Sequence, residues 1–367
     1  MNIAYRFRIY PTEEQKILLG KTFGCCRFLY NQMLNDKIRE YEKTKKMLKN
    51  TPAMYKKEYP FLKEVDSLAL ANVQLHLEKA YKNFFREPKI GFPRFKSKHH
   101  SRNSYTTNLV NGNILVESKR IRLPKVKWIA MKKHREPAED FRLKSVTVSM
   151  EPSGKYFASL LYEGYSCENQ AAESDYSTAK ILGIDYAMQG MAVFSEKIET
   201  EEAGFFRKNE KRLAREQRKL SRCVRGSHNY ELQKKKVARC HEKIRNQRRD
   251  YLHKLSRKIV DSYDAVAVED IDMKAMGQCL HFGKSVHDNG YGMFREMLDY
   301  KLAWKGKKIV KVDRFFPSSK KCCQCGRIKK ELKLSERVYH CVCGNEMDRD
   351  RNAAINIREE ARRMLIA

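Results

Sequence analysis

Two close pairs of cysteines near the C-terminal end of the sequence constrain the fold more than any other feature. Cys322 and Cys325 are separated by two residues, Cys341 and Cys343 by one, and a glycine directly follows each pair. A two-residue spacing with a glycine where the backbone must turn is typical of zinc knuckles, and the one-residue spacing of Cys341 and Cys343 departs slightly from this pattern without breaking it. Because four thiolates leave no open coordination position, the sequence predicts a closed, structural zinc site formed by these four residues.

Two residues next to the cysteine pairs are alternative candidates for zinc ligands. Cys323 lies inside the first knuckle and could compete with an adjacent thiol, whereas His340 beside Cys341 is a weaker substitute. Unrelated buried thiols are the alternative, which the paired spacing disfavours. The other cysteines are scattered among apolar or basic residues, and we expect reduced thiols at Cys25, Cys26, Cys167, Cys223, Cys240 and Cys279.

The chain is strongly basic along most of its length. Its 367 residues include 76 Lys and Arg against 45 Asp and Glu, a formal net charge of +31 at pH 7. This charge favours a polyanion, either nucleic acid or an anionic membrane surface. The sequence offers no acylation motif and no separate amphipathic anchor, so we expect nucleic acid and no membrane partner. It also has no apolar run that could span a bilayer and no signal-peptide core, and we expect a soluble protein that is not exported.

The first third of the sequence predicts a strand followed by helices. Residues 3–10 alternate apolar side chains with others, as a strand with one packed face does. Thr12 and Gln15 form the pattern of a capping box, and residues 12–87 predict a small helical module. Residues 91–98 alternate aromatic rings with cations, which would let the chain stack on bases while contacting phosphates. The alternative is a loop whose two Phe residues anchor it to the core.

The region that follows predicts a β domain, barrel-like in form. Residues 113–165 contain short apolar runs separated by turns, and the clearest hairpin spans 146–160. The N-terminal strand has no sheet of its own, so we expect it to pair here, which makes the helical module an insertion. Residues 166–179 are polar and predict a linker.

The C-terminal half alternates strands and helices, as an α/β domain does. Residues 205–263 have apolar positions at helical spacing and a break near Gly226, which predicts a helical hairpin. Its Lys- and Arg-rich stretches, 207–225 and 234–258, predict either a solvated face or a wall that tracks phosphates. The other expected elements are strands at 180–185, 191–194, 265–269 and 308–312 and a helix at 293–302.

Three acidic residues stand out by their positions. Asp185 and Glu269 end apolar strands, and Asp350 lies at the start of a helix, so all three can meet at the rim of one sheet. Three converging carboxylates would hold hard divalent cations, and two such ions can hydrolyse a phosphodiester. Each acid alone is more often a turn or cap residue. A negative cluster in so basic a chain nevertheless favours a bound cation.

These motifs, in order along nearly the whole chain, resemble the TnpB (OrfB) proteins of bacterial insertion sequences, relatives of the type V CRISPR effector nucleases. The segments that carry the resemblance are 5–11, 91–98, 104–106, 183–185, 268–270, 316–320, the two cysteine pairs and 348–354. The resemblance implies an α/β and β multi-domain fold: a ribonuclease H-like (RuvC) nuclease domain with a zinc-ribbon insert, and a wedge-like β-barrel domain with an inserted helical recognition domain.

Domain boundaries follow from the same resemblance. It implies a wedge β domain whose first strand is 1–11 and whose remainder, with a linker, is 101–179. The helical recognition domain is then 12–100. The RuvC-like domain occupies 180–316 and 348–367, and the zinc ribbon, an insert that binds target nucleic acid, occupies 317–347.

The resemblance also implies roles for the acids. Asp185, Glu269 and Asp350 are then the three RuvC catalytic residues, and they bind two Mg²⁺ ions, or Mn²⁺. The resemblance also implies one structural Zn²⁺, held by the four cysteines. Asp348 is less suited than Asp350, because the family's acid directly precedes the x-Asn-Ala-Ala segment. Many relatives carry a glycine shortly after the first acid where this chain has Tyr186-Ala187, so the turn there must be made differently.

The implied activity is that of a transposon-encoded, RNA-guided DNA endonuclease in the bacterial cytoplasm, associated with the nucleoid. Its partners are a guide RNA derived from the transposon end, double-stranded target DNA and the displaced single strand. The protein itself would read only a short DNA motif beside the target. Candidate readers, which could equally be capping and turn residues, are Ser67, Asn72, Tyr105 and Thr106.

Three other functions fit the sequence less well. A nuclease-dead, RNA-guided repressor would need no acids, yet all three are present. A CRISPR-associated type V effector of the same fold would be encoded beside a repeat array. A transposase that binds DNA through its zinc ribbon would join strands, which a hydrolytic nuclease does not.

Overall fold

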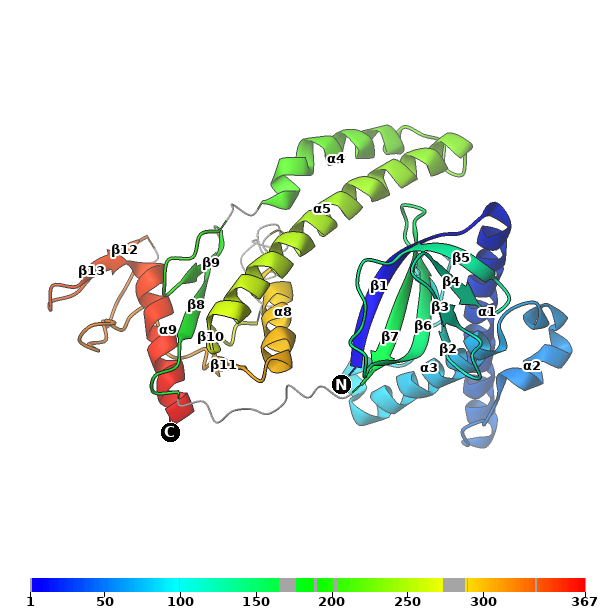
Figure 1. The fold of residues 1–367 in the computed structure, drawn as a ribbon, viewed down its shortest axis with the longest axis horizontal. Helices are drawn as coiled ribbons and strands as arrows, with labels where there is room; N and C mark the ends of the chain where they lie inside the picture. The colour runs from blue at the N-terminus through cyan, green and yellow to red at the C-terminus, as the bar shows by residue number, and fades with distance from the viewer. Residues whose placement is uncertain are drawn as a thin grey trace. The chain divides into compact units, whose positions relative to one another are not determined.

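The computed structural model describes residues 2–98, 100–164, 176–187, 190–200, 204–272, 288, 290–333 and 335–366. The chain divides into two compact units, Met1–Ser166 and Cys167–Ala367 (Figure 1). The boundary between them falls at the start of the expected linker, of which residues 166–175 lie outside the described part, as do Cys167 and Cys279. Each unit has its own apolar core.

The first unit is built on a seven-stranded antiparallel sheet with the order β2-β6-β7-β1-β5-β4-β3. The N-terminal strand β1 (Asn2–Tyr10) lies inside this sheet, between β7 and β5, which confirms that the helices after it are an insertion. The other strands are β2 (Asn103–Asn108), β3 (Leu115–Val116), β4 (Arg120–Leu123), β5 (Lys127–Lys132), β6 (Arg142–Met150) and β7 (Tyr156–Glu163).

Local sequence explains these strands. Phe7 and Ile9 of β1 are fully buried, as the alternation predicts. The expected hairpin is formed by β6 and β7, whose register pairs Val146 with Leu160. Its turn is closed where Gly154, at φ 82°, donates its N–H to the carbonyl of Glu151. The 146–160 prediction is therefore confirmed.

The insertion consists of helices α1 (Glu13–Thr44), α2 (Pro52–Glu58) and α3 (Ser67–Arg86) and the short 3₁₀ turns η1 (Pro60–Lys63) and η2 (Pro88–Ile90). The capping box at Thr12 and Gln15 begins α1, as predicted, and Asp66 caps α3 by accepting the N–H of Leu68. Buried side chains of α1, α3 and the sheet form one continuous apolar core.

The second unit has a four-stranded mixed sheet with the order β11-β10-β8-β9. Its strands are β8 (Ile181–Ala187), β9 (Met191–Phe194), β10 (Ala265–Glu269) and β11 (Lys308–Val312), and its helices are α4 (Phe205–Ser221), α5 (His228–Ser262), α8 (Tyr291–Trp304) and α9 (Arg349–Ile366). The strand pairs β8–β10 and β10–β11 are parallel, and β8–β9 is antiparallel. Every strand and helix expected in this half is confirmed within the described residues.

Helices cover both faces of this sheet (Figure 1). Leu182 and Ile184 of β8 point into an apolar cluster with α5 and α8. Ile181, on the opposite face, packs in a second cluster with Ile357 and Ala361 of α9. The alternation of strand side chains therefore places odd-numbered residues of β8 toward α9.

The expected helical hairpin is formed by α4 and α5. Gly226, at φ 84°, lies in the connecting turn, and Ser227 caps α5 by accepting the N–H of Tyr230. The two arms share a small apolar cluster of Leu213, Cys240 and Ile244. Within the described residues, the helices contain no stretch apolar and long enough to cross a membrane.

Between β11 and α9 the chain forms a small ribbon. Strands β12 (Val338–His340) and β13 (Glu346–Asp348) pair in an antiparallel arrangement, and Lys321 and Ile328 form an isolated bridge. This segment contains the two cysteine pairs and leads directly into α9.

Candidate active site and metal centre

Two of the predicted acids end neighbouring strands at the same edge of the sheet. The parallel register of β8 and β10 pairs Ile184 with Val268, and Asp185 and Glu269 are the next residues on each strand. Their side chains are partly exposed, whereas the residues before them are buried. The strands thus bring these two carboxylates together at the carboxyl edge of the sheet, as the sequence predicts.

The third acid is brought to this edge by α9. A Cβ atom on Gly183 would lie 2.0 Å from the carbonyl oxygen of Ala354 and 2.9 Å from Cβ of Arg358. The backbone of α9 therefore packs directly on β8, which only a glycine allows. Asp350 is one turn before Ala354, and its carboxylate is near enough to raise the pKa of Asp185.

The electrostatics of Asp185 fit an acidic cluster. Removal from water, followed by the charges of Glu269 and Asp350, raises the pKa of Asp185 to about 8, against weaker opposition from the N–H of Tyr186 and the charge of Arg349. Burial also raises the pKa of Glu269. Such a site favours protonated carboxyls unless a cation neutralises it.

The acids do not converge as closely as the thiols do. Among the described residues, the four predicted cysteine ligands form a group within 4.8 Å of one another, and the three carboxylates form no such group. Carboxylate oxygens are the donors that hard divalent cations prefer, so a cation held here would draw these groups closer together. Asp350 is also engaged by Arg349 at 3.3 Å and Arg337 at 3.9 Å.

Asp348 caps the N-terminal end of α9. Its carboxylate accepts the N–H of Arg351 at 2.9 Å, which is the contact of a helix cap at the start of α9. This agrees with the prediction that Asp350 is the better candidate for the acidic site.

The turn after the first acid is not where the sequence suggests. Tyr186 and Ala187 continue β8 and pair with Ala192 and Met191 of β9, so they make no turn. The expectation of an unusual turn at this dipeptide was therefore wrong. The Tyr186 ring instead packs on Tyr291, with 4.9 Å between ring centroids, which explains a large residue here. The connection contains Met188 and Gln189, which lie outside the described residues.

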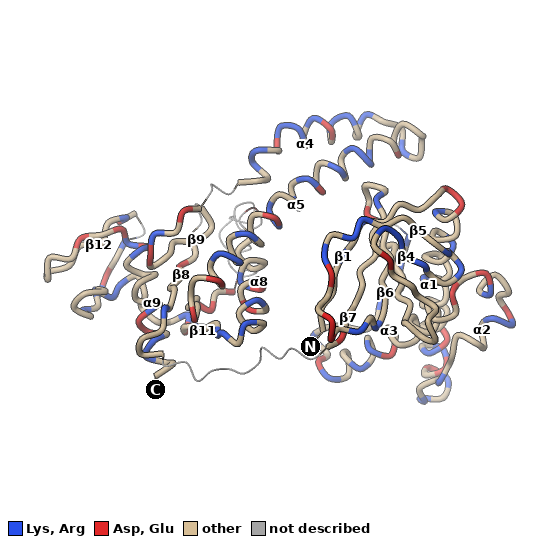
Figure 2. The backbone as a smooth tube through the Cα atoms, viewed as in Figure 1, with Lys and Arg blue, Asp and Glu red and all other residues tan. Residues whose placement is uncertain are grey.

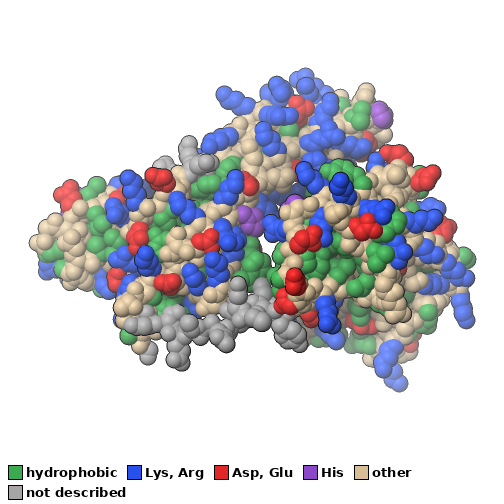
Figure 3. Space-filling view, in the orientation of Figure 1, with side chains coloured by type: hydrophobic (Ala, Val, Ile, Leu, Met, Phe, Trp, Pro, Cys, Tyr) green, Lys and Arg blue, Asp and Glu red, His purple; other side chains and the backbone are tan. Residues whose placement is uncertain are grey.

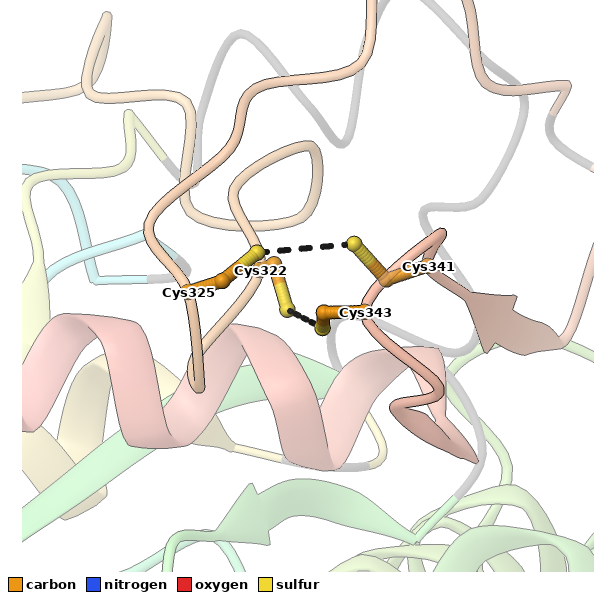
Figure 4. Close-up of side chains that lie close together, drawn as sticks. All are labelled: Cys322, Cys325, Cys341 and Cys343. Atoms are coloured by element: carbon orange, nitrogen blue, oxygen red, sulfur yellow. Dashed lines mark hydrogen bonds between the residues drawn. The ribbon is translucent and has the colours of Figure 1, made fainter.

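The cysteine pairs meet as predicted (Figure 4). The sulfur atoms of Cys322 and Cys343 are 3.7 Å apart, and those of Cys325 and Cys341 are 3.6 Å apart. A tetrahedral site with Zn–S bonds of about 2.3 Å has sulfur atoms roughly 3.8 Å apart, so the donor set fits zinc. Each knuckle turns at its glycine, with φ 75° at residue 326 and 90° at residue 344.

The thiols of this cluster differ in how readily they ionise. Burial opposes ionisation of Cys322, but the N–H groups of Cys325 and Gln324 and the amide of Asn345 lower its pKa to about 6. The N–H of Asn345 favours the thiolate of Cys343, yet burial and the neighbouring thiols raise its pKa to about 12. A cation held by these four sulfur atoms would favour their thiolate forms, so metal binding would release protons.

Neither alternative ligand belongs to this cluster. The sulfur of Cys323 lies 3.4 Å from that of Met347 and 3.6 Å from the amide nitrogen of Asn345. His340 pairs instead with Glu346 at 3.5 Å. The four-cysteine set is therefore the one the structure supports.

The candidate motif readers separate into two groups. Asn72, Tyr105 and Thr106 line a cavity of about 180 Å³ in the first unit, and Ser67 does not. Ser67 accepts a hydrogen bond from Lys56 at the start of α3. The basic side chains that line the same cavity are Arg27, His76, Lys96 and Arg102.

The aromatic and basic loop 91–98 is anchored to the core through one of its two Phe residues. Phe92 packs edge-on against Tyr81 and Phe84, with centroids 5.5 and 5.4 Å away, so it anchors the loop. The side chain of Asn31 holds the backbone of Lys96 at both N–H and carbonyl. Phe95, in contrast, is 56% exposed and open to stacking on another ring.

Cations gather on the α4–α5 hairpin. Lys and Arg residues follow both arms (Figure 2), and their side chains crowd the exposed surface of the hairpin (Figure 3). Exposed cations on α4 include Lys211, Arg212, Arg215, Arg218 and Lys219.

Sequence profiles of three families match successive parts of the chain. The OrfB_IS605 family, described as "Probable transposase", matches residues 164–279. The "Cas12f1-like, TNB domain" matches 291–357, and a "Helix-turn-helix domain" of the OrfB_IS605 group matches 1–46, which form β1 and α1 here.

Full-length relatives decide the family. A "Putative RNA-guided DNA endonuclease" of Streptomyces pristinaespiralis is 35% identical over 366 residues, with 96% of this chain and 88% of the relative covered. The chain belongs to the TnpB (OrfB) family. Another member of this TnpB-like group, "Putative RNA-guided DNA endonuclease InsQ" of Escherichia coli K12, is 30% identical over 96% of this chain and 91% of its own.

The TnpB assignment agrees with the fold. A cryo-EM structure of a Cas12f1-sgRNA-target DNA complex matches with a TM-score of 0.58 over 98% of each chain, at 13% identity. The likeness shows a shared multi-domain α/β fold. Ser318, whose hydroxyl lies 3.3 Å from the carboxylate of Glu269, is a site residue that the sequence did not single out. The signal that could have found it is its place in the 316–320 segment typical of TnpB proteins.

Proposed function

We propose that this chain is an RNA-guided DNA endonuclease that hydrolyses phosphodiester bonds of target DNA. The observation that carries the proposal is the 35% identity, over 96% of the chain, to a relative named for that activity. The meeting of Asp185 and Glu269 at one sheet edge, with Asp350 on the helix packed beside it, supports it.

The domains follow the family plan in this proposal. Residues 1–11 and 101–179 form the wedge-like β-barrel domain, and 12–100 form the recognition domain. Residues 180–316 and 348–367 form the RuvC domain around a zinc ribbon at 317–347. The position of β1 within the seven-stranded sheet supports the first part, and the four-cysteine cluster supports the last.

The three acids are proposed to be the catalytic residues and to hold Mg²⁺ or Mn²⁺. Carboxylate oxygens are the donors these hard cations prefer, and the raised pKa of Asp185 indicates a site that gains from a positive charge. When bound, such cations supply an activated water and stabilise the leaving oxyanion. Burial raises the pKa of Glu269, and the hydroxyl of Ser318, 3.3 Å away, partly opposes this rise.

Recognition is assigned to the basic surfaces. The α4–α5 hairpin is proposed to track the phosphates of an RNA–DNA heteroduplex, and the cavity at Asn72, Tyr105 and Thr106 to read the motif beside the target. The guide is proposed to derive from the transposon end, and the displaced strand to pass to the acids. The setting of this activity is the bacterial cytoplasm, at the nucleoid.

The test is to sequence the RNA that co-purifies with the protein and to offer DNA that matches it. We expect one defined RNA, and cleavage in Mg²⁺ of matched DNA but not of DNA with a scrambled target. Absence of a defined RNA would contradict the proposal. Specific binding without cleavage would favour a repressor, and joined strands would favour a transposase.

A further inference from the structure

A buried serine, Ser318, lies in the segment between the acidic site and the four-cysteine cluster. Ser318 is 7% exposed, and its Oγ is 3.3 Å from Oε1 of Glu269. The hydroxyl donates a hydrogen bond to this carboxylate, which is an acceptor when ionised. A hydrogen bond to one oxygen also restricts how the carboxylate can rotate.

Two buried amides of α9 hold the segment that carries this serine. The Asn356 side chain donates to the carbonyl of Ser318 at 2.8 Å and to that of Lys321 at 2.6 Å. The Asn352 side chain donates to the carbonyl of Lys321 at 2.7 Å and accepts the N–H of Cys323 at 3.0 Å. Asn352 is fully buried and Asn356 is 3% exposed, so losing these bonds would leave polar groups unpaired in the interior.

The same short segment therefore meets both proposed metal sites. Residues 318–323 begin at the serine that contacts Glu269 and end within the first cysteine knuckle. Because α9 also carries Asp350, the two amides fix the segment relative to an acid of the same site. A shift of the knuckle would be passed to Ser318 through a fixed set of hydrogen bonds.

We propose that Ser318 is a positioning residue that orients Glu269 for a divalent cation, and that Asn352 and Asn356 couple its position to the four-cysteine ribbon. This inference rests on the proposed role of Glu269 as a cation ligand. Hydrogen-bond partners of metal ligands typically change metal affinity by about 10–100-fold when they are removed. The cysteine cluster would then support cation binding at the acids without contributing a ligand to it.

The experiment compares Ser318→Ala with Ser318→Thr, which keeps the hydroxyl, and with Ser319→Ala, its neighbour in the same loop. Each full-length protein, with its co-purified RNA, is titrated with Mn²⁺ and free Mn²⁺ is measured by electron paramagnetic resonance. The Asp185→Ala complex gives the background from RNA and surface sites. Zinc content and RNA content are measured on the same samples.

We expect Ser318→Ala to weaken Mn²⁺ binding by about 10-fold or more, with zinc and RNA content unchanged. Ser318→Thr should retain most of the affinity, and Ser319→Ala should match the unaltered protein. Equal Mn²⁺ affinity in Ser318→Ala and the unaltered protein would overturn the inference. If the unaltered protein itself binds no Mn²⁺ above the Asp185→Ala background, the proposed role of the acids fails instead.

The coupling is tested by removing zinc with a chelator before the same titration. We expect Mn²⁺ affinity to fall in the unaltered protein and to fall less in Ser318→Ala, because the hydroxyl that transmits the effect is already absent. An equal fall in both proteins, or none in either, would contradict coupling through Ser318.

Discussion

At the scale of single residues, Gly183 determines how closely α9 approaches the sheet. A methyl group there would lie 2.0 Å from a backbone carbonyl oxygen that cannot rotate away. We expect Gly183→Ala to displace α9 and to lower the free energy of unfolding of the second unit by about 1–3 kcal/mol or more. Gly292→Ala is the control, because its Cβ would meet nothing within 4 Å. Urea denaturation of both variants checks this; equal stability would show that α9 does not rest on β8.

The raised pKa of Asp185 predicts how stability depends on pH. Its pKa is about 8 in the folded protein and 3.8 ordinarily, so the folded state binds a proton that the unfolded state has lost between these values. Without divalent cations, stability should fall as pH rises from about 4 to about 8. Asp185→Asn should flatten this fall and melt at a higher temperature at pH 8. Thermal unfolding in EDTA measures it, and a steeper fall in the variant would contradict the assignment.

Residue patterns predicted much of this site, and the exceptions share a cause. The predicted ends of two strands located Asp185 and Glu269, and the predicted start of a helix located Asp350. Hydrophobic periodicity allows this because it shows where strands and helices begin and end. The need for glycine at 183 and the bond from Ser318 to Glu269 depend on how distant segments pack, which periodicity does not encode. The turn assigned to Tyr186-Ala187 failed for the same reason, since the contact with Tyr291 is tertiary.

At the scale of elements, the ribbon depends on its four thiols. We expect Cys341→Ser to lose zinc and to unfold the ribbon, because a structural zinc site supplies folding energy to so small an element. Cys323→Ser should keep one zinc per chain, because this sulfur faces Met347 and Asn345 rather than the cluster. Elemental analysis of the purified proteins measures the zinc. Loss of zinc from Cys323→Ser would show that the ligand set is wrong.

The exposed cations of the α4–α5 hairpin predict how binding to nucleic acid depends on salt concentration. Replacing Lys211, Arg212 and Arg218, which are exposed on α4, with Gln should weaken binding to nucleic acid. The slope of log affinity against log salt concentration should fall by about 0.7–0.9 for each phosphate that the variant no longer neutralises. Exchanging Lys for Arg and Arg for Lys at the same positions keeps the charge and should keep the slope. An unchanged slope in the Gln variant would make this face a solvated surface only.

At the scale of the whole molecule, the second unit carries the four-cysteine cluster and, under the proposed function, a separate acidic site. The four-cysteine cluster has the donor set of a closed structural metal site, with sulfur atoms 3.7 Å apart between Cys322 and Cys343 and 3.6 Å apart between Cys325 and Cys341. The acids belong to elements far apart in the sequence, and the packing of β8, β10 and α9 brings them near one another. The ribbon lies between β11 and α9 in the chain, so the order of segments joins the two sites.

The central claim is that these acids cut DNA chosen by RNA. The most direct measurement is the single-turnover cleavage rate of guide-matched DNA in Mg²⁺ by the RNA-bound, full-length protein. We predict that Asp185→Ala, Glu269→Ala and Asp350→Ala each reduce the rate to the uncatalysed background while RNA binding persists. Asp348→Ser, which keeps a helix-capping oxygen, should cut at nearly the unaltered rate. Cleavage that survives loss of Asp185, or that is lost with Asp348→Ser but not with Asp350→Ala, would contradict this account.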